Sequence, residues 1–169
     1  MIKTKLMDQQ KAVVEFCVET NKLPYAGIFS DYGTGKTLMA LAIIAVMQLV
    51  KTKKFKKILV VSTSLSIEST WCDEIRKHSD FRFCILKGTA KARANLSEYA
   101  VNKIDRPDRY GYHNESTHPI IVLINFDGVK SIYGELARAG FDAVFVDEST
   151  KIKTHDTART MALYEVGKR

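Results

Sequence analysis

Short apolar segments alternate along this chain with longer segments in which apolar residues recur at helical spacing. Five of the short segments are typical of strands: residues 25–29, 57–62, 81–86, 119–125 and 142–148. The second, fourth and fifth are almost continuously apolar, as strands buried on both faces of a sheet are. Helices are predicted beside them at residues 7–20, 36–50, 66–79, 89–104 and 127–138. This order of strand–helix units predicts a three-layer, doubly wound α/β fold with a mostly parallel sheet and right-handed crossovers.

The length of 169 residues is typical of one domain, and we expect residues 1–169 to fold as one unit. Residues 105–118 are polar, contain proline and glycine, and are predicted to form an exposed loop. In the helix predicted at 66–79, Ser66 is the expected N-cap, because a serine hydroxyl can accept a hydrogen bond from the first turn of a helix. The sequence contains no internal repeat, low-complexity tract or domain linker.

Basic residues outnumber acidic residues by 26 to 19, which gives a formal net charge of +7. An excess of this size favours polyanions such as nucleic acid, although charge alone identifies no partner. Five lysines within residues 51–57 follow a predicted helix. They are open to two interpretations, contact with DNA or compensation of the helix dipole, and we favour the second.

The three cysteines, Cys17, Cys72 and Cys84, have neither disulfide nor zinc spacing, so reduced thiols among apolar neighbours are expected. The apolar runs fall well short of the roughly 20 residues that cross a bilayer. The N-terminus has lysines but lacks the apolar core of a signal peptide. We therefore expect a soluble, cytoplasmic protein that does not contact membranes.

A glycine-rich turn stands between the first predicted strand and the second predicted helix: Gly33, Thr34, Gly35, Lys36 and Thr37. This is the context of a phosphate-binding P-loop, in which glycines bring backbone N–H groups close to phosphate oxygens. Lys36 would reach the β- and γ-phosphates, and Thr37 would place its hydroxyl on Mg²⁺. The general pattern has another glycine where this chain has Ser30. A glycine turn without a ligand is the alternative, and the correct placement of strand and helix disfavours it.

A pair of carboxylates follows the last predicted strand in the segment AVFVDESTKIK, residues 143–153. Asp147 and Glu148 would lie at the carboxyl edge of the sheet, where ligands of open α/β sheets bind. We expect Asp147 to hold Mg²⁺ through its water shell and Glu148 to polarise the attacking water. Because a small-molecule kinase needs no carboxylate dedicated to water, Glu148 favours hydrolysis. Lys36, Asp147 and Glu148 are thus the catalytic candidates. Taken alone, two adjacent carboxylates more often begin a helix, and it is the combination with the P-loop that favours a nucleotide site.

One alternative is a GTPase, because NKID at residues 102–105 matches the tetrad that reads guanine in those proteins. That tetrad follows a buried strand in GTPases, whereas here it ends a segment of helical spacing. The chain also lacks an aspartate-x-x-glycine between the P-loop and this tetrad. A GTPase is therefore disfavoured.

Five segments, taken in order, resemble the first ATPase lobe of superfamily 2 helicases, and specifically the Swi/Snf-type branch of DNA translocases. The segments are LMDQQKAVVEF (6–16), SDYGTGKT (30–37), VVSTSLSIESTWCDEIRKH (60–78), VLINFDGVKS (122–131) and DESTKIKT (147–154). They are similar to that family's opening glutamine motif and to its motifs I, Ia, Ib and II. Thr150 stands where the family usually has histidine.

The resemblance implies a RecA-like P-loop NTPase fold that binds ATP and Mg²⁺, with Gln10 as the residue that reads adenine. It implies that Ser64, Asn125 and Lys130 contact the phosphate backbone of DNA, and such contacts carry no sequence specificity. The divergence of the chain from eukaryotic remodellers favours a viral or bacterial relative.

The resemblance also implies a second RecA-like lobe, in cis or in trans, because these motors hydrolyse ATP between two lobes and take arginines from the second. Either the chain is a fragment of such a motor, or its sheet closes in another way. An arginine of this kind contributes about a thousandfold or more to related phosphoryl transfers. We therefore expect this chain alone to bind ATP·Mg²⁺ with little turnover.

Three functions are open at this point. The leading one is the first motor lobe of an ATP-dependent DNA translocase or helicase. The second is a single-lobe module that binds a nucleotide or a partner protein without turnover. The third is a basic DNA-binding domain in which the P-loop is incidental.

Overall fold

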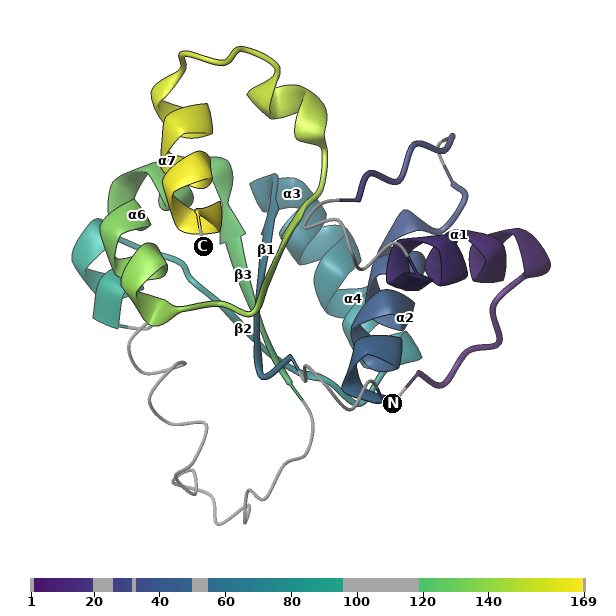
Figure 1. Cartoon of the computed structure of the whole chain (residues 1–169). Coiled ribbons are helices and arrows are strands. Elements are labelled where there is room, and N and C mark those ends of the chain that lie inside the picture. The colour runs from purple at the N-terminus through teal and green to yellow at the C-terminus, as the bar shows by residue number, and fades with distance from the viewer. Residues whose placement is uncertain (1, 20–25, 32, 50–54, 96–118, 169) are drawn as a thin grey trace, which may run out of the picture.

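The computed structural model describes residues 2–19, 26–31, 33–49, 55–95 and 119–168. Its centre is a four-stranded parallel sheet with the strand order β2-β3-β1-β4. The strands are β1 (Lys57–Ser62), β2 (Arg82–Ile85), β3 (Ile120–Asn125) and β4 (Ala143–Val146). Helices cover both faces of this sheet (Figure 1). The predicted three-layer α/β/α fold with a parallel sheet is confirmed.

One face of the sheet is covered by α2 (Lys36–Leu49) and by a continuous helical segment after β1, while α1 (Asp8–Glu19) packs on the outer side of α2. The segment after β1 comprises α3 (Ser64–Ser66), a π-helical turn (Ile67–Trp71) and α4 (Cys72–His78). The other face is covered by α6 (Phe126–Ala139) and α7 (Ala158–Gly167). A 3₁₀ turn (Ser149–Ile152) connects β4 to α7, and residues 90–95 are also helical.

The core is divided by the sheet, and β1 contributes to both halves. Ile58 and Val60 pack with α2 and α4, whereas Leu59 and Val61 pack with α6 and α7. All four side chains have an exposed fraction of 0%. Successive residues of a strand point to opposite faces, so a strand covered on both sides must be apolar at every position. This explains the unbroken apolar runs of β1 and β3.

Most of the predicted elements form within two residues of the expected bounds, but the strand predicted at 25–29 does not. Residues 26–31 are outside the sheet, and the Phe29 side chain is 95% exposed. A strand needs a neighbour that pairs with its backbone, and among the described residues this stretch has none. Apolar composition alone therefore misled the prediction.

The N-cap prediction for the third helix was also wrong. The helix begins at Ser64, and the hydroxyl of Thr63 accepts the N–H of Ser66 at 3.2 Å. Ser66 is thus in the first turn, where its side chain is available for a different contact. Helix α7 was not predicted at all.

Several predictions fall wholly or partly outside the described residues. These are the end of the helix predicted at 89–104, the loop predicted at 105–118, the tetrad at 102–105 and most of the lysine run at 51–57.

The three cysteines are free thiols, as expected. Burial raises the pKa of the Cys84 thiol to about 11, and it also raises the pKa values of Cys17 and Cys72. Little thiolate therefore forms near neutral pH. Within the described ranges, no helix has the length and apolar character needed to cross a membrane.

We expect Gly128→Ala to lower the free energy of unfolding by about 1–3 kcal/mol. Asn125 caps α6 by accepting the N–H of Gly128 at 2.7 Å. A methyl group on Gly128 would lie 2.8 Å from that Asn125 oxygen and 2.7 Å from Ile124 Cγ1, so the cap would have to shift.

The matched control is Gly134→Ala in the same helix, where an added methyl group meets no atom closer than 4.0 Å. This change should leave stability unaltered or raise it by up to about 1 kcal/mol. Urea unfolding of both variants measures the difference. Equal effects of the two substitutions would contradict the role given to Gly128.

Candidate functional site

The glycine-rich loop adopts a conformation that needs its glycines. Gly33 and Gly35 have φ angles of 78° and 80°, in the left-handed region that glycine adopts without steric cost. At Gly35 a Cβ atom would also lie 2.7 Å from the side-chain nitrogen of Gln10. The close approach of α1 to this loop therefore depends on glycine at position 35.

Gln10 holds the loop against α1. Its side chain is buried, with 6% exposed. Its Nε2 donates to the carbonyl of Thr34 at 3.0 Å, and its Oε1 accepts the N–H of Met7 at 3.0 Å. The structure thus places Gln10 beside the predicted P-loop, and its reading of adenine stays a prediction.

The Lys36 ammonium is folded over the loop. It donates to the carbonyls of Ser30 and Asp31, each at 2.8 Å. The hydroxyl of Thr34 also donates to the Asp31 carbonyl and lies 2.8 Å from the Ser30 hydroxyl. Ser30, which replaces a glycine of the general pattern, therefore links the start of the loop to Thr34 and Lys36 through its hydroxyl and its carbonyl. A phosphate entering the loop would compete with carbonyl oxygens for the same ammonium.

Helix α2 points its N-terminus toward the carboxyl edge of the sheet. Figure 1 shows α2 running antiparallel to β1, and its apolar side chains pack on that strand. Its 14 residues span about 21 Å, close to the length of β1. The N–H groups of its first turn have no helical acceptor and carry the positive end of the helix dipole. Thr37 is half-buried in this turn.

Asp147 follows β4 directly, and three side chains hold one of its oxygens. Its Oδ2 accepts hydrogen bonds from Ser62 Oγ at 3.0 Å, Trp71 Nε1 at 3.0 Å and Ser66 Oγ at 3.3 Å. Its Oδ1 accepts the backbone N–H of Glu148 at 2.9 Å. The carboxylate is therefore fixed in direction by donors from β1 and from the helical segment that follows it.

The sequence prediction missed Ser62, Ser66 and Trp71 as partners of Asp147. The signal that would have revealed Ser62 is strand order, because β1 lies beside β4 with Val61 level with Val146. The next residues along each strand, Ser62 and Asp147, must then be neighbours.

Glu148 lies at a sharp turn after Asp147. Its φ and ψ of 52° and 48° are left-handed, an uncommon conformation for a residue with a side chain. Its exposed carboxylate accepts a long hydrogen bond of 3.5 Å from the Thr63 hydroxyl. The two adjacent carboxylates therefore differ, because Asp147 is held by protein donors and Glu148 faces solvent.

The structure brings together two of the three predicted DNA contacts. Asn125 Nδ2 donates to Ser64 Oγ at 2.7 Å, and both residues line a hollow of about 230 Å³. We call this space, with Glu68, Lys87 and Arg93 also on its wall, the Asn125 hollow. Lys130 is exposed and lines a different hollow of about 250 Å³, formed with Asp127 and the start of α7.

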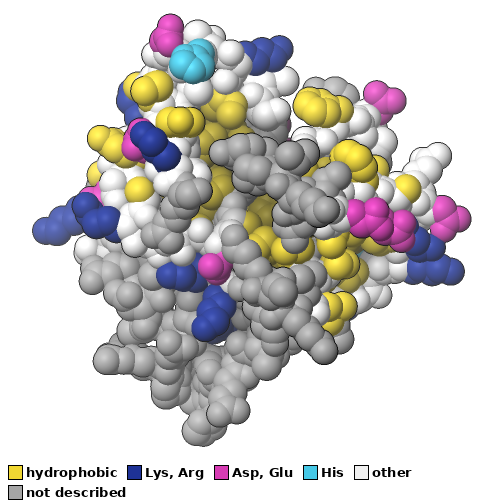
Figure 2. Space-filling model, in the orientation of Figure 1, with side chains coloured by type: hydrophobic (Ala, Val, Ile, Leu, Met, Phe, Trp, Pro, Cys, Tyr) yellow, Lys and Arg dark blue, Asp and Glu magenta, His cyan; other side chains and the backbone are white. Residues whose placement is uncertain are grey.

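Among the described residues on the face that Figure 2 draws, basic side chains do not form one continuous patch, and acidic side chains lie between them. Some basic side chains form ion pairs with acidic ones, including Arg159 with Asp127 at 2.9 Å and Lys87 with Glu68 at 2.6 Å. Net charge therefore does not by itself identify a surface for nucleic acid.

Comparison with known proteins identifies the family to which this sequence is similar. A sequence profile described as "SNF2-related domain" matches residues 9–169 of this chain. No curated protein matches the chain in sequence.

Two solved structures are similar in fold. One is the Sulfolobus solfataricus SWI2/SNF2 ATPase core in complex with dsDNA, with a TM-score of 0.67 and 21% identity over 98% of this chain and 30% of that one. The other is a nuclease-deletion mutant of the Type ISP restriction-modification enzyme LlaGI in complex with a DNA substrate mimic. It has a TM-score of 0.67 and 17% identity over 90% of this chain and 16% of that one. The chain therefore spans less than a third of either protein.

We expect Asp147→Ala to change the fluorescence of Trp71, the single tryptophan of the chain, because the indole N–H loses its carboxylate acceptor. The free energy of unfolding should fall by about 1–3 kcal/mol, since buried donors are left without a partner. Emission spectra and urea unfolding measure both effects.

Glu148→Ala is the matched control, because it removes the adjacent, exposed carboxylate. Its emission spectrum should equal that of the unsubstituted protein. If the two variants shift the spectrum alike, the assigned contact between Trp71 and Asp147 is wrong.

Proposed function

Because this chain belongs to the SNF2-related domain family, we propose that it is the first RecA-like lobe of an ATP-dependent DNA translocase or helicase. The observation that carries the proposal is the loop of residues 33–37, closed by Gln10 and Lys36, at the N-terminus of a helix aimed toward the edge where Asp147 is fixed. Residues 1–169 then form one lobe, and a second lobe in cis or in trans completes the motor.

We propose that ATP is the nucleotide and that its phosphates bind in the loop of residues 33–37. Backbone N–H groups there and the positive end of α2 favour phosphate oxygens. Lys36 would exchange its two carbonyl acceptors for the β- and γ-phosphates, which offer it full negative charge.

The residues present also fit Mg²⁺, a hard cation that prefers oxygen ligands and is usually held by one or two carboxylates together with phosphates. Among the described residues no three His, Cys, Asp or Glu side chains cluster as metal ligands. Thr37 would supply a hydroxyl and Asp147 a carboxylate. When bound, the ion would offset the charge that develops on the phosphates.

We propose that ATP is hydrolysed at the carboxyl edge of the sheet, beside Asp147 and Glu148. The donors on Asp147 keep its carboxylate from turning when nucleotide binds. Glu148 is exposed, and among the described residues its carboxylate accepts one long hydrogen bond, from Thr63. It is therefore suited to accept a proton from an attacking water. Lys36 would stabilise negative charge on the γ-phosphate as the bond breaks.

We propose that DNA is the partner and that it is bound through its phosphate backbone. Ser64 and Asn125, already in contact, and the exposed Lys130 are the candidate contacts. Both similar structures contain DNA or a DNA mimic, and the chain has a net charge of +7. Contacts to phosphates position a protein without reading sequence, as a motor that moves along any sequence requires.

A module that binds nucleotide or a partner protein without turnover is the alternative function. It predicts the same nucleotide affinity but no stimulation by DNA, even with a second lobe present. Measuring ATP hydrolysis with and without duplex DNA, after the chain is joined to a second RecA-like lobe, separates the two. For the chain alone we expect ATP·Mg²⁺ binding with little turnover.

We expect Lys36→Ala to weaken ATP·Mg²⁺ binding by at least about tenfold, because each lost charge-assisted contact contributes about 1.5–3 kcal/mol. Isothermal titration calorimetry measures the change. Lys77→Ala, which removes the same charge from an exposed position on α4, is the control and should leave affinity unchanged. Equal affinities of the Lys36 variant and the control would favour a basic domain with an incidental P-loop.

A further inference from the structure

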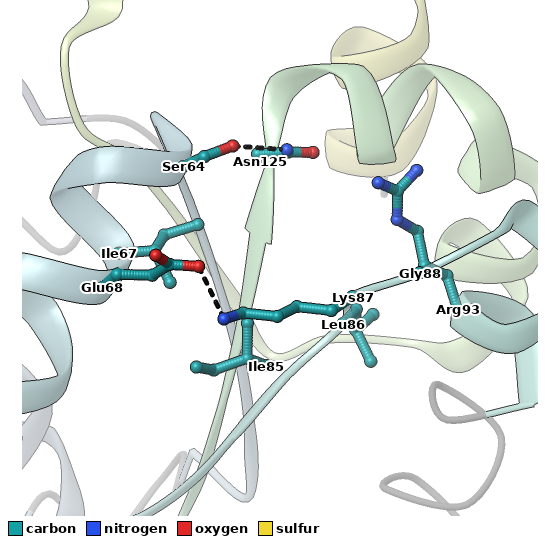
Figure 3. A pocket seen from close by; sticks show the side chains of 9 residues that line it. All are labelled: Ser64, Ile67, Glu68, Ile85, Leu86, Lys87, Gly88, Arg93 and Asn125. Carbon is teal, nitrogen blue, oxygen red and sulfur yellow. Dashed lines mark hydrogen bonds and ion pairs between the residues drawn. The ribbon is translucent and has the colours of Figure 1, made fainter.

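The Asn125 hollow lies between the carboxyl end of β2 and the helical segment that follows β1 (Figure 3). Its floor is apolar and consists of Ile67, Ile85 and Leu86. Its wall is polar, with the linked pair Ser64 and Asn125 at one end. A space of about 230 Å³ is large enough for a phosphate group with part of its sugar.

Two cations line this hollow, and they come from a different part of the chain than Ser64 and Asn125. Lys87 lies in the segment that follows β2, and Arg93 lies in the helical residues 90–95. Arg93 Nη1 donates to the Ser131 hydroxyl at 3.1 Å. Its Nε is buried and has no hydrogen-bond acceptor among the described residues. A buried donor without an acceptor is uncommon. Arg82 Nε and Nη2 are further such atoms among the described residues, so the case for an anion at Arg93 rests on the place of this side chain at the hollow.

Glu68 already forms an ion pair with one of the two cations, Lys87. Figure 3 shows the Lys87 side chain extending across the hollow to the Glu68 carboxylate, with which it forms an ion pair of 2.6 Å. Both side chains are more than half exposed, at 58% and 57%. An exposed pair of this kind contributes little to stability, so a competing anion can separate it at small cost.

We propose that the Asn125 hollow binds one phosphodiester group of DNA through Lys87 and Arg93, and that Glu68 competes with this phosphate for Lys87. The inference rests on the proposed function, since it takes DNA as the ligand. It adds two binding residues to those implied by the family resemblance and an acidic residue that opposes them. Glu68 therefore limits the affinity of the chain for DNA, both by occupying Lys87 and by repelling the phosphate.

The test is Glu68→Gln in the 169-residue chain, with binding to a fluorescently labelled duplex measured by anisotropy over a series of salt concentrations. We expect affinity to rise roughly three- to tenfold at low salt and the slope of log K against log salt to steepen by about one, as one more phosphate contact predicts. Arg93→Gln should weaken binding and make the slope shallower.

Two further variants make the test specific. Glu135→Gln removes the same charge from another exposed ion pair, that with Arg138, and should raise affinity much less. Lys87→Gln should reduce affinity more in the Glu68→Gln background than in the unsubstituted protein, because only there is the lysine fully available. Circular dichroism confirms that each variant is folded.

The outcomes separate this inference from the proposed function. If the unsubstituted chain binds duplex DNA and Glu68→Gln matches Glu135→Gln in affinity and salt slope, competition at Lys87 is excluded and the proposed function stands. If neither the unsubstituted chain nor any variant binds DNA, both proposals fail, and nucleotide binding remains to be judged by the Lys36 variant.

Discussion

The parallel pairing of β1 with β3 on one side and with β4 on the other is the constraint on which the candidate sites depend. Ser62 is level with Asn125 across one ladder, and Val61 is level with Val146 across the other. The carboxyl ends of the strands therefore meet at one edge, although the segments that follow them are far apart in sequence. This is the edge at which ligands of open α/β sheets bind.

The helical segment that follows β1 connects the two candidate sites. Ser66 and Trp71 donate to Asp147, while Ser64, in the same first turn as Ser66, accepts from Asn125 at the wall of the Asn125 hollow. One short element thus contacts the carboxylate proposed for ATP hydrolysis and the hollow proposed for DNA. A displacement of this element by DNA would alter the donors on Asp147, which gives a physical route by which DNA could influence hydrolysis.

The elements predicted correctly are those whose signal is local in the sequence. The predictions failed where the conformation or contacts of a segment depend on a partner elsewhere in the chain. The apolar runs of β1 and β3 are local signals, and the structure confirms both strands. The glycines of the loop are another local signal, and Gly33 and Gly35 adopt the left-handed conformation that a tight turn needs. Residues 25–29 are apolar too, but strand formation needs a neighbour with a free edge. The roles of Ser66 and Trp71 depend on strand order, which periodicity does not reveal. The ion pair of Glu68 with Lys87 joins segments whose proximity no sequence pattern indicated.

The central claim is that the loop at residues 33–37 and Asp147 serve one bound nucleotide. The most direct test replaces Mg²⁺ by paramagnetic Mn²⁺ and records which backbone amide resonances of the chain are broadened when the Mn²⁺ complex of ATP binds. We expect strong broadening at Gly35, Lys36 and Thr37 together with Asp147 and Glu148, and much weaker broadening at Lys87. Broadening confined to the loop, or to Asp147 alone, would contradict the claim.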